Sequence, residues 1–482
     1  MLGKLGQRLE VPGIGTVVGK AVDGVTKAPA TNGVVRLFQG STPEIANYIS
    51  QTNLALDGTY SFANAVQFGR YYVAVEVAGY ITNMVVAASW KCTSYSGTTC
   101  IAYQDTAPNS VLYKNYKRLA TISAGLALPS APVLNAVTNK IYISNYDNNS
   151  ISVVNASTNS FVKKITISGK PAAAIMNLNK KQIYVASIAG GNQVNGWVTI
   201  IDQSTDAVLK EIPIKEIRTT SSYSPVPNEP TLFNENDPVG QLDAVRNRLY
   251  VFGQTTISVI DLTTLSVTKE ITMSARLTGL NFVSKTNTLY ALDEDGVVTV
   301  INASTYATIT TIATGGSGSV QGVYAADRDF ILIPNAGENT VTVIATNINS
   351  VAATLTVGNS PRDLIYNYLK KAVYVSNFES KTISIISLYD LSVVENVSVN
   401  DQLFYRVIPI NLTERVYSLA FPKTSFQVIA DTNSDPTQTS CNVVIQTIDI
   451  PAIGRQPFLN TITDKLYIPA DDGKLYVYGP GA

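Results

Sequence analysis

The sequence predicts an all-β protein in which a small antiparallel β-sandwich precedes a β-propeller. Three observations predict this fold. Short runs of β-branched and aromatic residues are separated by Gly, Asp, Asn and Pro, as expected for strands joined by turns. Side chains alternate between apolar and polar in stretches such as "RYYVAVEV". A four-strand phrase recurs with a period of about 40 residues, which is typical of propeller blades.

Residues 13–112 predict the sandwich, and residues 1–12 are expected to form an N-terminal arm. The runs "GTVVGKAVD", "GVVRLFQG" and "ALDGTYSFANAVQFGRYYVAVEVAGY" read as short strands between turns. The phrases "TVVGKAVDG", "DGTYSF" and "GRYYVAVEVAGY" resemble the carboxypeptidase-regulatory-like, or prealbumin-like, β-sandwich. That resemblance implies a stalk, spacer or adhesion unit without catalysis of its own.

Residues 113–482 predict the propeller. Each repeat contains four strands, and the second strand carries an aromatic residue. These aromatic residues are Tyr142, Tyr184, Tyr250, Tyr290, Phe330, Tyr374, Tyr417 and Tyr467. A single blade cannot bury both faces of its sheet, so each blade needs its neighbours, and the repetition is structural.

The count of repeats predicts eight blades, and the irregular stretch 421–450 leaves seven as the alternative. The last repeat, "FLNTITDKLYIPADDGKLYVYGPGA", ends after its third strand. We expect "YKRLATISAG" at 116–125 to supply the fourth strand. Joining the first and last strands would close the ring and remove a sheet edge.

The repeats resemble the YVTN-type β-propeller family, which occurs in surface-layer and other secreted proteins. The family phrase appears as "IYISNYDNNSISVVNAST", "AVYVSNFESKTISII" and "ILIPNAGENTVTVIAT". The resemblance implies a scaffold, and a scaffold does not define an activity.

Composition excludes several classes of function. The chain has no histidine, so Ser-His-Asp and Cys-His nucleophile systems and HExxH zinc sites cannot form. We therefore predict that the protein is not an enzyme, with no catalytic residue, metal site or cofactor. The 35 basic and 35 acidic residues cancel without a basic stripe, which argues against a nucleic-acid partner. No apolar run has the length of a membrane span, and "MLGKLGQRLEVPGIGTVVG" contains none of signal-peptide length.

Two cysteines lie close together in "WKCTSYSGTTCIAY". Cys92 and Cys100 flank a Ser-Gly turn, a spacing that suits a disulfide across a hairpin loop. The alternative is a pair of reduced thiols.

One position after the third strand of four repeats holds a short polar residue: Asn155, Asp202, Asp261 and Asn302. We expect its side chain to accept backbone N–H bonds and fix the turn. N-glycosylation sequons begin at Asn148, Asn155, Asn302, Asn396 and Asn411, which permit modification of an exterior protein. The acidic segments 292–298 and 469–475 read as Asp-Gly hairpin turns, with a bound cation as the alternative.

The repeat is interrupted in one region, because Tyr184 and Tyr250 are 66 residues apart. The excess lies at 186–198, between the second and third strands of one blade, and at 215–239, before the next blade. Both connection types emerge on the same face of a propeller, so we expect them side by side. Their aromatic and amide residues suit carbohydrate or protein binding, and the alternative is a packed Ω-loop. The candidate binding residues are Asn192, Trp197, Tyr223, Asn228, Phe233 and Glu235.

These features favour a non-enzymatic structural or adhesion protein on an extracellular or virion surface. The sandwich would be its base or stalk and the propeller its binding head, as in a virion vertex, fibre or spike protein. Expected partners are protein or carbohydrate on a cell or particle surface, capsid or surface-layer neighbours, and further copies in a homo-oligomer. Two alternatives remain. One is an intracellular propeller scaffold for protein–protein interaction, and the other is a propeller lactonase with a carboxylate-bound cation.

Overall fold

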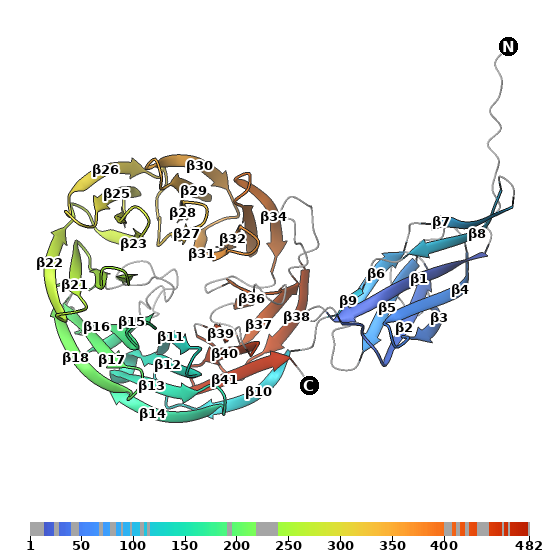
Figure 1. The fold of residues 1–482 in the computed structure, drawn as a ribbon, viewed down its shortest axis with the longest axis horizontal. Helices are drawn as coiled ribbons and strands as arrows, with labels where there is room; N and C mark the ends of the chain where they lie inside the picture. The colour runs from blue at the N-terminus through green and yellow to red at the C-terminus, as the bar shows by residue number, and fades with distance from the viewer. Residues whose placement is uncertain are drawn as a thin grey trace, which may run out of the picture. The chain divides into compact units, whose positions relative to one another are not determined.

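The computed structural model contains two compact units, one ending at Tyr116 and the other spanning Lys117–Gly479 (Figure 1). The structure describes residues 14–23, 28–39, 48–66, 71–77, 83–87, 90–96, 99–106, 110–112, 116–189, 195–217, 240–399, 407–410, 415–419, 424–430, 443–455, 457–460 and 463–480. In these residues, no helix combines the length and the apolar character that crossing a membrane requires. The predicted arm, residues 1–12, lies outside them.

The N-terminal unit contains two sheets. The first has the order β4-β1-β8-β7, with β9 also paired to β1. Its strands are β1 (Ile14–Asp23), β4 (Thr59–Val66), β7 (Trp90–Ser96), β8 (Thr99–Thr106) and β9 (Ser110–Leu112). The second has the order β3-β2-β5-β6. Its strands are β2 (Gly33–Gln39), β3 (Tyr48–Asn53), β5 (Tyr71–Val77) and β6 (Asn83–Ala87).

One apolar core joins the two sheets, as expected for a sandwich. Val17 and Phe62 from the first sheet share a buried cluster with Val35 and Val73 from the second. The prediction of a purely antiparallel arrangement was wrong for one strand. β1 pairs antiparallel with β4 but parallel with β8 and β9. Parallel neighbours need a long crossover, and the chain between β1 and β8 provides one.

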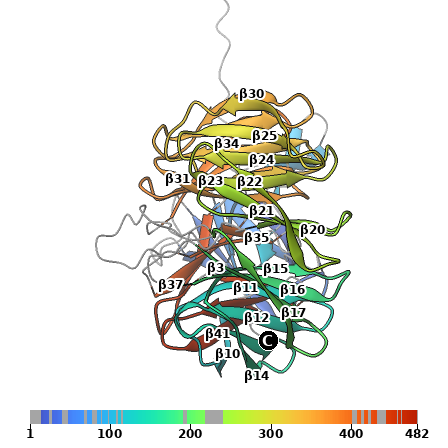
Figure 2. The ribbon, with the colours of Figure 1, turned by 90° about the vertical axis from the view of Figure 1, so that its left-hand side faces the viewer.

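The second unit is a ring of four-stranded antiparallel sheets, seen face-on in Figure 1 and from the side in Figure 2. Seven sheets, blades 1 to 7, each contain four strands that are consecutive in sequence. Blade 1 contains β11 (Pro129–Asn135), β12 (Lys140–Asn145), β13 (Ser150–Asn155) and β14 (Ser160–Thr166), with a 3-10 turn η2 (Tyr146–Asn148). Blade 2 contains β15 (Lys170–Asn177), β16 (Gln182–Ile188), β17 (Gly196–Asp202) and β18 (Ala207–Ile214). Blade 3 contains β19 (Gly240–Asp243), β20 (Arg248–Phe252), β21 (Thr256–Asp261) and β22 (Ser266–Thr272).

The remaining consecutive blades follow the same order. Blade 4 contains β23 (Leu277–Val283), β24 (Thr288–Asp293), β25 (Val297–Asn302) and β26 (Thr308–Ala313). Blade 5 contains β27 (Val323–Ala325), β28 (Phe330–Asn335), β29 (Thr340–Ala345) and β30 (Ser350–Thr356). Blade 6 contains β31 (Pro361–Asn367), β32 (Ala372–Asn377), β33 (Thr382–Ser387) and β34 (Ser392–Ser398). Blade 7 contains β35 (Val407–Ile410), β36 (Arg415–Leu419), β37 (Ser425–Ala430) and β38 (Val443–Asp449).

A further four-stranded sheet, blade 8, joins the two ends of the ring in the order β10-β41-β40-β39. Its strands are β10 (Tyr116–Ser123), β39 (Phe458–Asn460), β40 (Lys465–Pro469) and β41 (Lys474–Pro480). The predicted closing strand at 116–125 is therefore confirmed. The strand pairing gives seven blades of consecutive strands and this closing blade, which together match the eight repeats counted in the sequence.

The recurring aromatic of the second strand is a buried core position. Tyr142, Tyr184, Tyr250, Tyr290, Tyr374 and Tyr467 are among the largest fully buried side chains. In blade 5 the prediction was wrong by two residues. Leu332 pairs with Val343 in the register in which Tyr142 pairs with Val153, whereas Phe330 begins its strand and is half-buried. Leu332 is therefore the buried equivalent of the tyrosines. Phe330 lies two residues earlier, on the same face of the strand but at its start.

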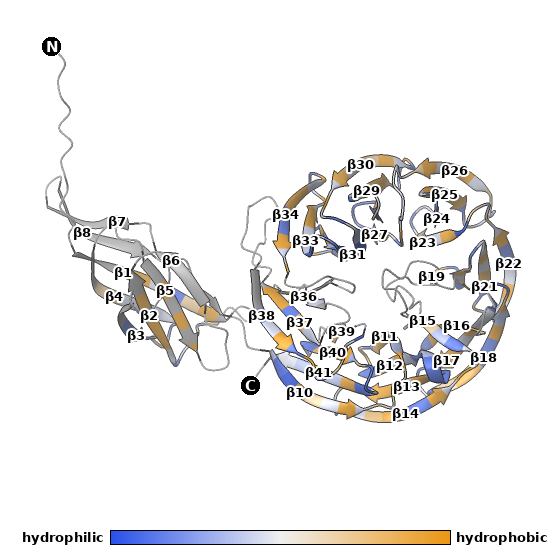
Figure 3. Ribbon diagram, turned by 180° about the vertical axis from the view of Figure 1, so that it is seen from behind, coloured by the Kyte–Doolittle hydropathy of each residue, from blue (hydrophilic) through white to orange (hydrophobic). Residues whose placement is uncertain are grey.

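Apolar contacts between neighbouring blades hold the ring together. Each of seven buried clusters draws its residues from two adjacent blades, from the junction of blades 8 and 1 to that of blades 6 and 7. At the junction of blades 7 and 8, the rings of Phe426 and Tyr478 meet edge to face with centroids 5.1 Å apart. Hydrophobic residues, orange in Figure 3, recur along the strands around the ring.

Hydrogen bonds between blades converge on one carbonyl, that of the residue directly after the third strand. At four junctions a side chain of the preceding blade donates to it. The bonds are Tyr467 Oη to Ala156 O (3.1 Å), Lys180 Nζ to Leu262 O (2.9 Å), Arg248 Nη1 to Ala303 O (2.9 Å) and Arg328 Nε to Leu388 O (3.0 Å). At two further junctions a tyrosine hydroxyl lies near the carbonyl but donates over a shorter distance to a side chain of the same next blade: Tyr142 Oη to Asp206 Oδ1 (2.7 Å) and Tyr290 Oη to Asn349 Oδ1 (2.5 Å). The four acceptor residues are buried, so their carbonyls are not free to bind water.

Replacing Tyr467 with Phe should destabilise the ring at its closure. The substitution leaves the buried Ala156 carbonyl without the donor that crosses from blade 8, which should lower the free energy of unfolding by about 1–3 kcal/mol. Tyr389→Phe is the matched control, because this side chain is 57% exposed and should change stability by less than about 0.5 kcal/mol. Urea unfolding followed by tryptophan fluorescence measures both variants. Equal midpoints for the two would contradict the role assigned to this bond.

Candidate binding site at the junction of blades 2 and 3

The first insertion opens from a regular hairpin in blade 2. β16 and β17 pair without interruption from Gln182↔Asp202 to Ile188↔Gly196. Beyond them, the amide of Ala189 donates to the carbonyl of Asn195 at 3.0 Å and closes the base of the loop. Residues 190–194, including Asn192, lie outside the described residues.

The second insertion begins after β18 and is held by Glu216. The carboxylate of Glu216 accepts bonds from the Thr255 amide (2.9 Å) and the Thr256 hydroxyl (3.2 Å) in blade 3. Gly253 makes room for this contact, since a Cβ there would lie 2.3 Å from the Cβ of Glu216. Glu216 thus links the start of the second insertion, which follows blade 2, to the β20–β21 turn of blade 3. Residues 218–239, including Tyr223, Asn228, Phe233 and Glu235, lie outside the described residues.

The bases of the two insertions adjoin. A Cβ on Gly196, at the end of the first loop, would lie 3.2 Å from the Cδ1 atom of Ile217, at the start of the second. Ile217 is fully buried in the apolar cluster that joins blades 2 and 3. The predicted adjacency of the two insertions is therefore seen where they leave the ring.

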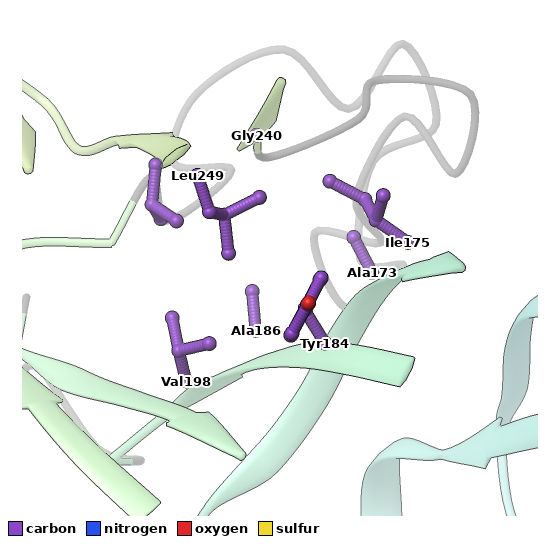
Figure 4. A pocket seen from close by; sticks show the side chains of 8 residues that line it. Ala173, Ile175, Tyr184, Ala186, Val198, Gly240 and Leu249 are labelled. Carbon is purple, nitrogen blue, oxygen red and sulfur yellow. The ribbon is translucent and has the colours of Figure 1, made fainter. Parts of the chain in front are cut away.

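An apolar cavity of about 10 Å³ lies between blades 2 and 3, beside the strands that carry the two insertions (Figure 4). Its lining is Ala173, Ile175, Tyr184, Ala186, Val198, Gly240, Leu249 and Val251. The lining is aliphatic except for Tyr184. This volume is on the order of the space of one water molecule, which is too small for a larger ligand.

Trp197 lies on β17, where it pairs with Ser187 and Pro213. Its half-buried ring packs against Gly169, where a Cβ would lie 2.9 Å from the Cε3 atom of the indole. Because Gly169 has a φ of +74°, this close contact depends on glycine for both space and backbone conformation. Trp197 thus has a packing role between blades 1 and 2, and the other predicted binding residues lie outside the described residues.

The turn role of Asn155, Asp202, Asp261 and Asn302 is confirmed. Each side-chain oxygen accepts the amides two and three residues ahead, at 2.7–3.1 Å. In the aspartates this changes the acidity. The backbone amide of Thr205 is the main cause that lowers the pKa of Asp202, and that of Thr264 lowers the pKa of Asp261.

Sequence analysis missed a second set of the same turns, between the first and second strands. There Asn135, Asp243 and Asn367 each accept two amides of the turn, and Asn177 and Asn460 accept one each. The signal was present as an Asn or Asp followed, four residues later, by an Asn, Asp or Lys, which the structure places in a left-handed conformation. These polar side chains stabilise turns of the propeller, and we assign them no role in binding.

The acidic segments are turns, as predicted. Asp293 accepts the amides of Asp295 and Val297, and Gly296 supplies the positive φ. Asp472 accepts the amide and the ammonium group of Lys474 and the hydroxyl of Tyr476. In the part of the chain that the structure describes, no group of three or more Asp, Glu, Cys or His could hold a metal ion.

The glycosylation sequons lie in several settings. Asn155 and Asn302 use their oxygens in turns, and Asn396 is exposed on the outer strand β34, where it accepts the Ser384 hydroxyl at 2.6 Å. Asn148 accepts the hydroxyl of its own sequon residue Ser150 at 2.5 Å. Asn411 lies outside the described residues. Modification of these residues remains a prediction.

The two cysteines of the N-terminal unit lie on neighbouring strands. In the antiparallel register of β7 and β8, Cys92 is opposite Tyr103 and Cys100 is opposite Tyr95. The strands are irregular between Cys92 and Tyr95. The bridge itself remains a prediction.

No family model matches the chain, and no curated protein matches it either. The propeller assignment therefore depends on the strand pairing and on the recurring buried positions.

Replacing Asp202 and Asp261 together with Asn should flatten the acid dependence of stability. A carboxyl group with a lowered folded-state pKa stabilises fully above its unfolded pKa of about 4, and this contribution is lost as pH falls through the folded value. Asn should preserve the turn, as it does at Asn155 and Asn302. Thermal unfolding at about pH 5 and about pH 2.5 is the measurement, and we expect the midpoint of the variant to fall less than that of the parent. An equal fall would show that these turns do not contribute to acid sensitivity.

Proposed function

We propose that this chain is a non-enzymatic, surface-exposed structural or adhesion protein whose propeller is the binding head. The carrying observation is that two insertions leave the ring at one blade junction and adjoin at their bases. Blades 1, 4, 5 and 6, which the structure describes in full, have only short turns between their strands. Recognition sites are often built from loops that a rigid scaffold positions.

The distribution of polar groups supports a binding role over a catalytic one. Carboxylates that sequence patterns single out accept turn amides, as at Asp202, Asp261 and Asp293. Glu216, at the start of the second insertion, accepts the Thr255 amide of blade 3 and so fixes the base of that loop. The partner would be a protein or carbohydrate on a cell or particle surface, met by the aromatic and amide residues of the two insertions.

We place the propeller in the YVTN-type family as part of this proposal. In blades 1, 5 and 6 the family phrase has an Asn at the end of the second strand, and this Asn is fully buried: Asn145, Asn335 and Asn377. Its Nδ2 atom donates to a hydroxyl on the third strand, with distances of 2.9 Å to Ser152, 2.8 Å to Thr342 and 2.8 Å to Ser384. This gives the recurring Asn a structural reason. The N-terminal sandwich would serve as base or stalk, and the whole would lie outside a cell or on a virion.

Replacing residues 190–194 with Asn-Gly tests the binding role. Ala189 and Asn195 already form a hydrogen bond, so a two-residue turn can join them without moving β16 or β17. The probes are an array of microbial surface polysaccharides and intact microbial cells. We expect the parent protein to bind a subset of them and the variant to bind at least about tenfold more weakly, a loss of roughly 1.4 kcal/mol.

The matched control is Val245→Ser, in the turn between the first and second strands of blade 3. This side chain is 79% exposed and lies in a connection of the other type, so its loss should leave binding unchanged. A parent protein that binds none of the probes, or a shortened variant that binds like the parent, would overturn the proposed site.

The exterior location has its own measurement, which is intact mass and non-reducing peptide mapping of natively sourced protein. We expect a Cys92–Cys100 bridge, because an oxidising exterior preserves disulfides, and glycan on at least one sequon. Two free thiols together with an unmodified mass would contradict an exterior location.

A further inference from the structure

The outermost strands of the ring differ in how their exposed edges are protected. In the blades they are β10, β14, β18, β22, β26, β30, β34 and β38. An outer strand presents a row of backbone N–H and C=O groups that can pair with another chain, and charged residues on the strand oppose that pairing.

Most of these strands carry charge. Lys117 and Arg118 lie on β10, Lys163 and Lys164 on β14, Lys210 and Glu211 on β18, Lys269 and Glu270 on β22, Glu395 on β34 and Asp449 at the end of β38. β26, "TITTIA", and β30, "SVAATLT", carry none. These two strands belong to neighbouring blades and lie next to each other on the rim (Figure 1).

The difference is in charge and not in backbone shape. The β25–β26 and β29–β30 pairs each contain the same bulge as the β21–β22 pair, at Val300/Ile301, Val343/Ile344 and Val259/Ile260. After the bulge, the two residues that are Lys269 and Glu270 in blade 3 are Thr310 and Thr311 in blade 4 and Ala353 and Thr354 in blade 5. Apolar side chains also remain exposed on the uncharged strands, with Ile309 at 50% and Val351 at 40%.

We infer that the edge formed by β26 and β30 is a docking surface for the same edge of a second copy of this chain. The two copies would pair edge to edge in an antiparallel, two-fold arrangement that continues their sheets.

Charge decides in favour of a second copy. In a two-fold contact an edge meets the same edge of the second copy, so an edge that carries two lysines, such as that of β14, would bring like charges together. Uncharged Thr, Ala, Val and Ile side chains meet their copies without that repulsion, and they have the β-propensity that strand pairing requires. Each copy would contribute only two short outer strands, β26 and β30, so we expect weak association that depends on protein concentration.

The structure supplies a substitution that the fold should accept. In blade 1 the same two positions hold Lys163 and Lys164, opposite Val153 and Ser152. In blade 4, Thr310 and Thr311 lie opposite Val300 and Thr299, and in blade 5, Ala353 and Thr354 lie opposite Val343 and Thr342. The facing residues are a valine and a short hydroxyl side chain in all three blades, so a pair of lysines should fit in blades 4 and 5 as it does in blade 1.

Sedimentation equilibrium of the full chain is the test. We expect the parent protein to show a monomer–dimer equilibrium. The variant Thr310→Lys, Thr311→Lys, Ala353→Lys, Thr354→Lys should stay monomeric at concentrations at least about tenfold higher, equivalent to roughly 1.4 kcal/mol. Thermal unfolding of the variant checks that it is folded. The control is Lys163→Arg, Lys164→Arg on β14, which keeps the charge and should leave the equilibrium unchanged.

Two results would overturn the inference. One is a parent protein that remains monomeric, with or without an extended segment of another protein captured at this edge. The other is a folded quadruple variant that dimerises as the parent does. Neither result depends on the loops of blades 2 and 3, so this test and the binding test fail independently.

Discussion

The ring depends on satisfying one buried carbonyl at the turn after the third strand, which the structure describes in six blades. The residue after the third strand is enclosed by the neighbouring blade, and at six positions its amide donates to the residue in left-handed conformation that precedes the second strand of its own blade. Its carbonyl then faces the preceding blade and needs a donor from there. Leaving a buried backbone carbonyl unpaired would cost about 1–3 kcal/mol at each junction. The turn within a blade and the contact between blades are thus fixed by the same residue.

The donors to this turn differ around the ring. Tyr467 reaches the carbonyl from the middle of the second strand, whereas Arg248 reaches it from the start of that strand and Lys180 from the turn before it. The hydroxyls of Tyr142 and Tyr290, at the same position as Tyr467, donate instead to Asp206 and Asn349 in the turn after the third strand of the next blade. Burial raises the pKa of Tyr290 and of Tyr467 to about 12, so both hydroxyls keep their protons and donate throughout the physiological range. In blade 5 Arg328 is the donor, and the apolar Leu332 can therefore occupy the tyrosine position.

This variation explains how much of the structure could be predicted from the sequence. Periodicity identified the blades and their closing strand, because buried positions recur and the last repeat lacks a strand. The register of the second strands was harder to predict. Phe330 was aligned with the tyrosines, but in blade 5 the donor to the next blade is Arg328, before the second strand, and Leu332 occupies the tyrosine position. The parallel pairing of β1 with β8 was missed because local patterns do not report contacts between segments that are distant in sequence. The same reason hid Glu216, whose partner Thr255 is 39 residues away.

The same physics indicates where function can be placed. Positions that recur in the blades are committed to turns, to the core or to the carbonyl contact, so a ligand site there would disturb the ring. Two kinds of position are free of that commitment. One is the pair of insertions between blades 2 and 3, which leave the ring at fixed bases and do not alter the strands beside them. The other is the outer strand of each blade, whose exposed side chains can change charge without changing the register. Recognition of a foreign surface and contact between copies can therefore vary independently on one scaffold.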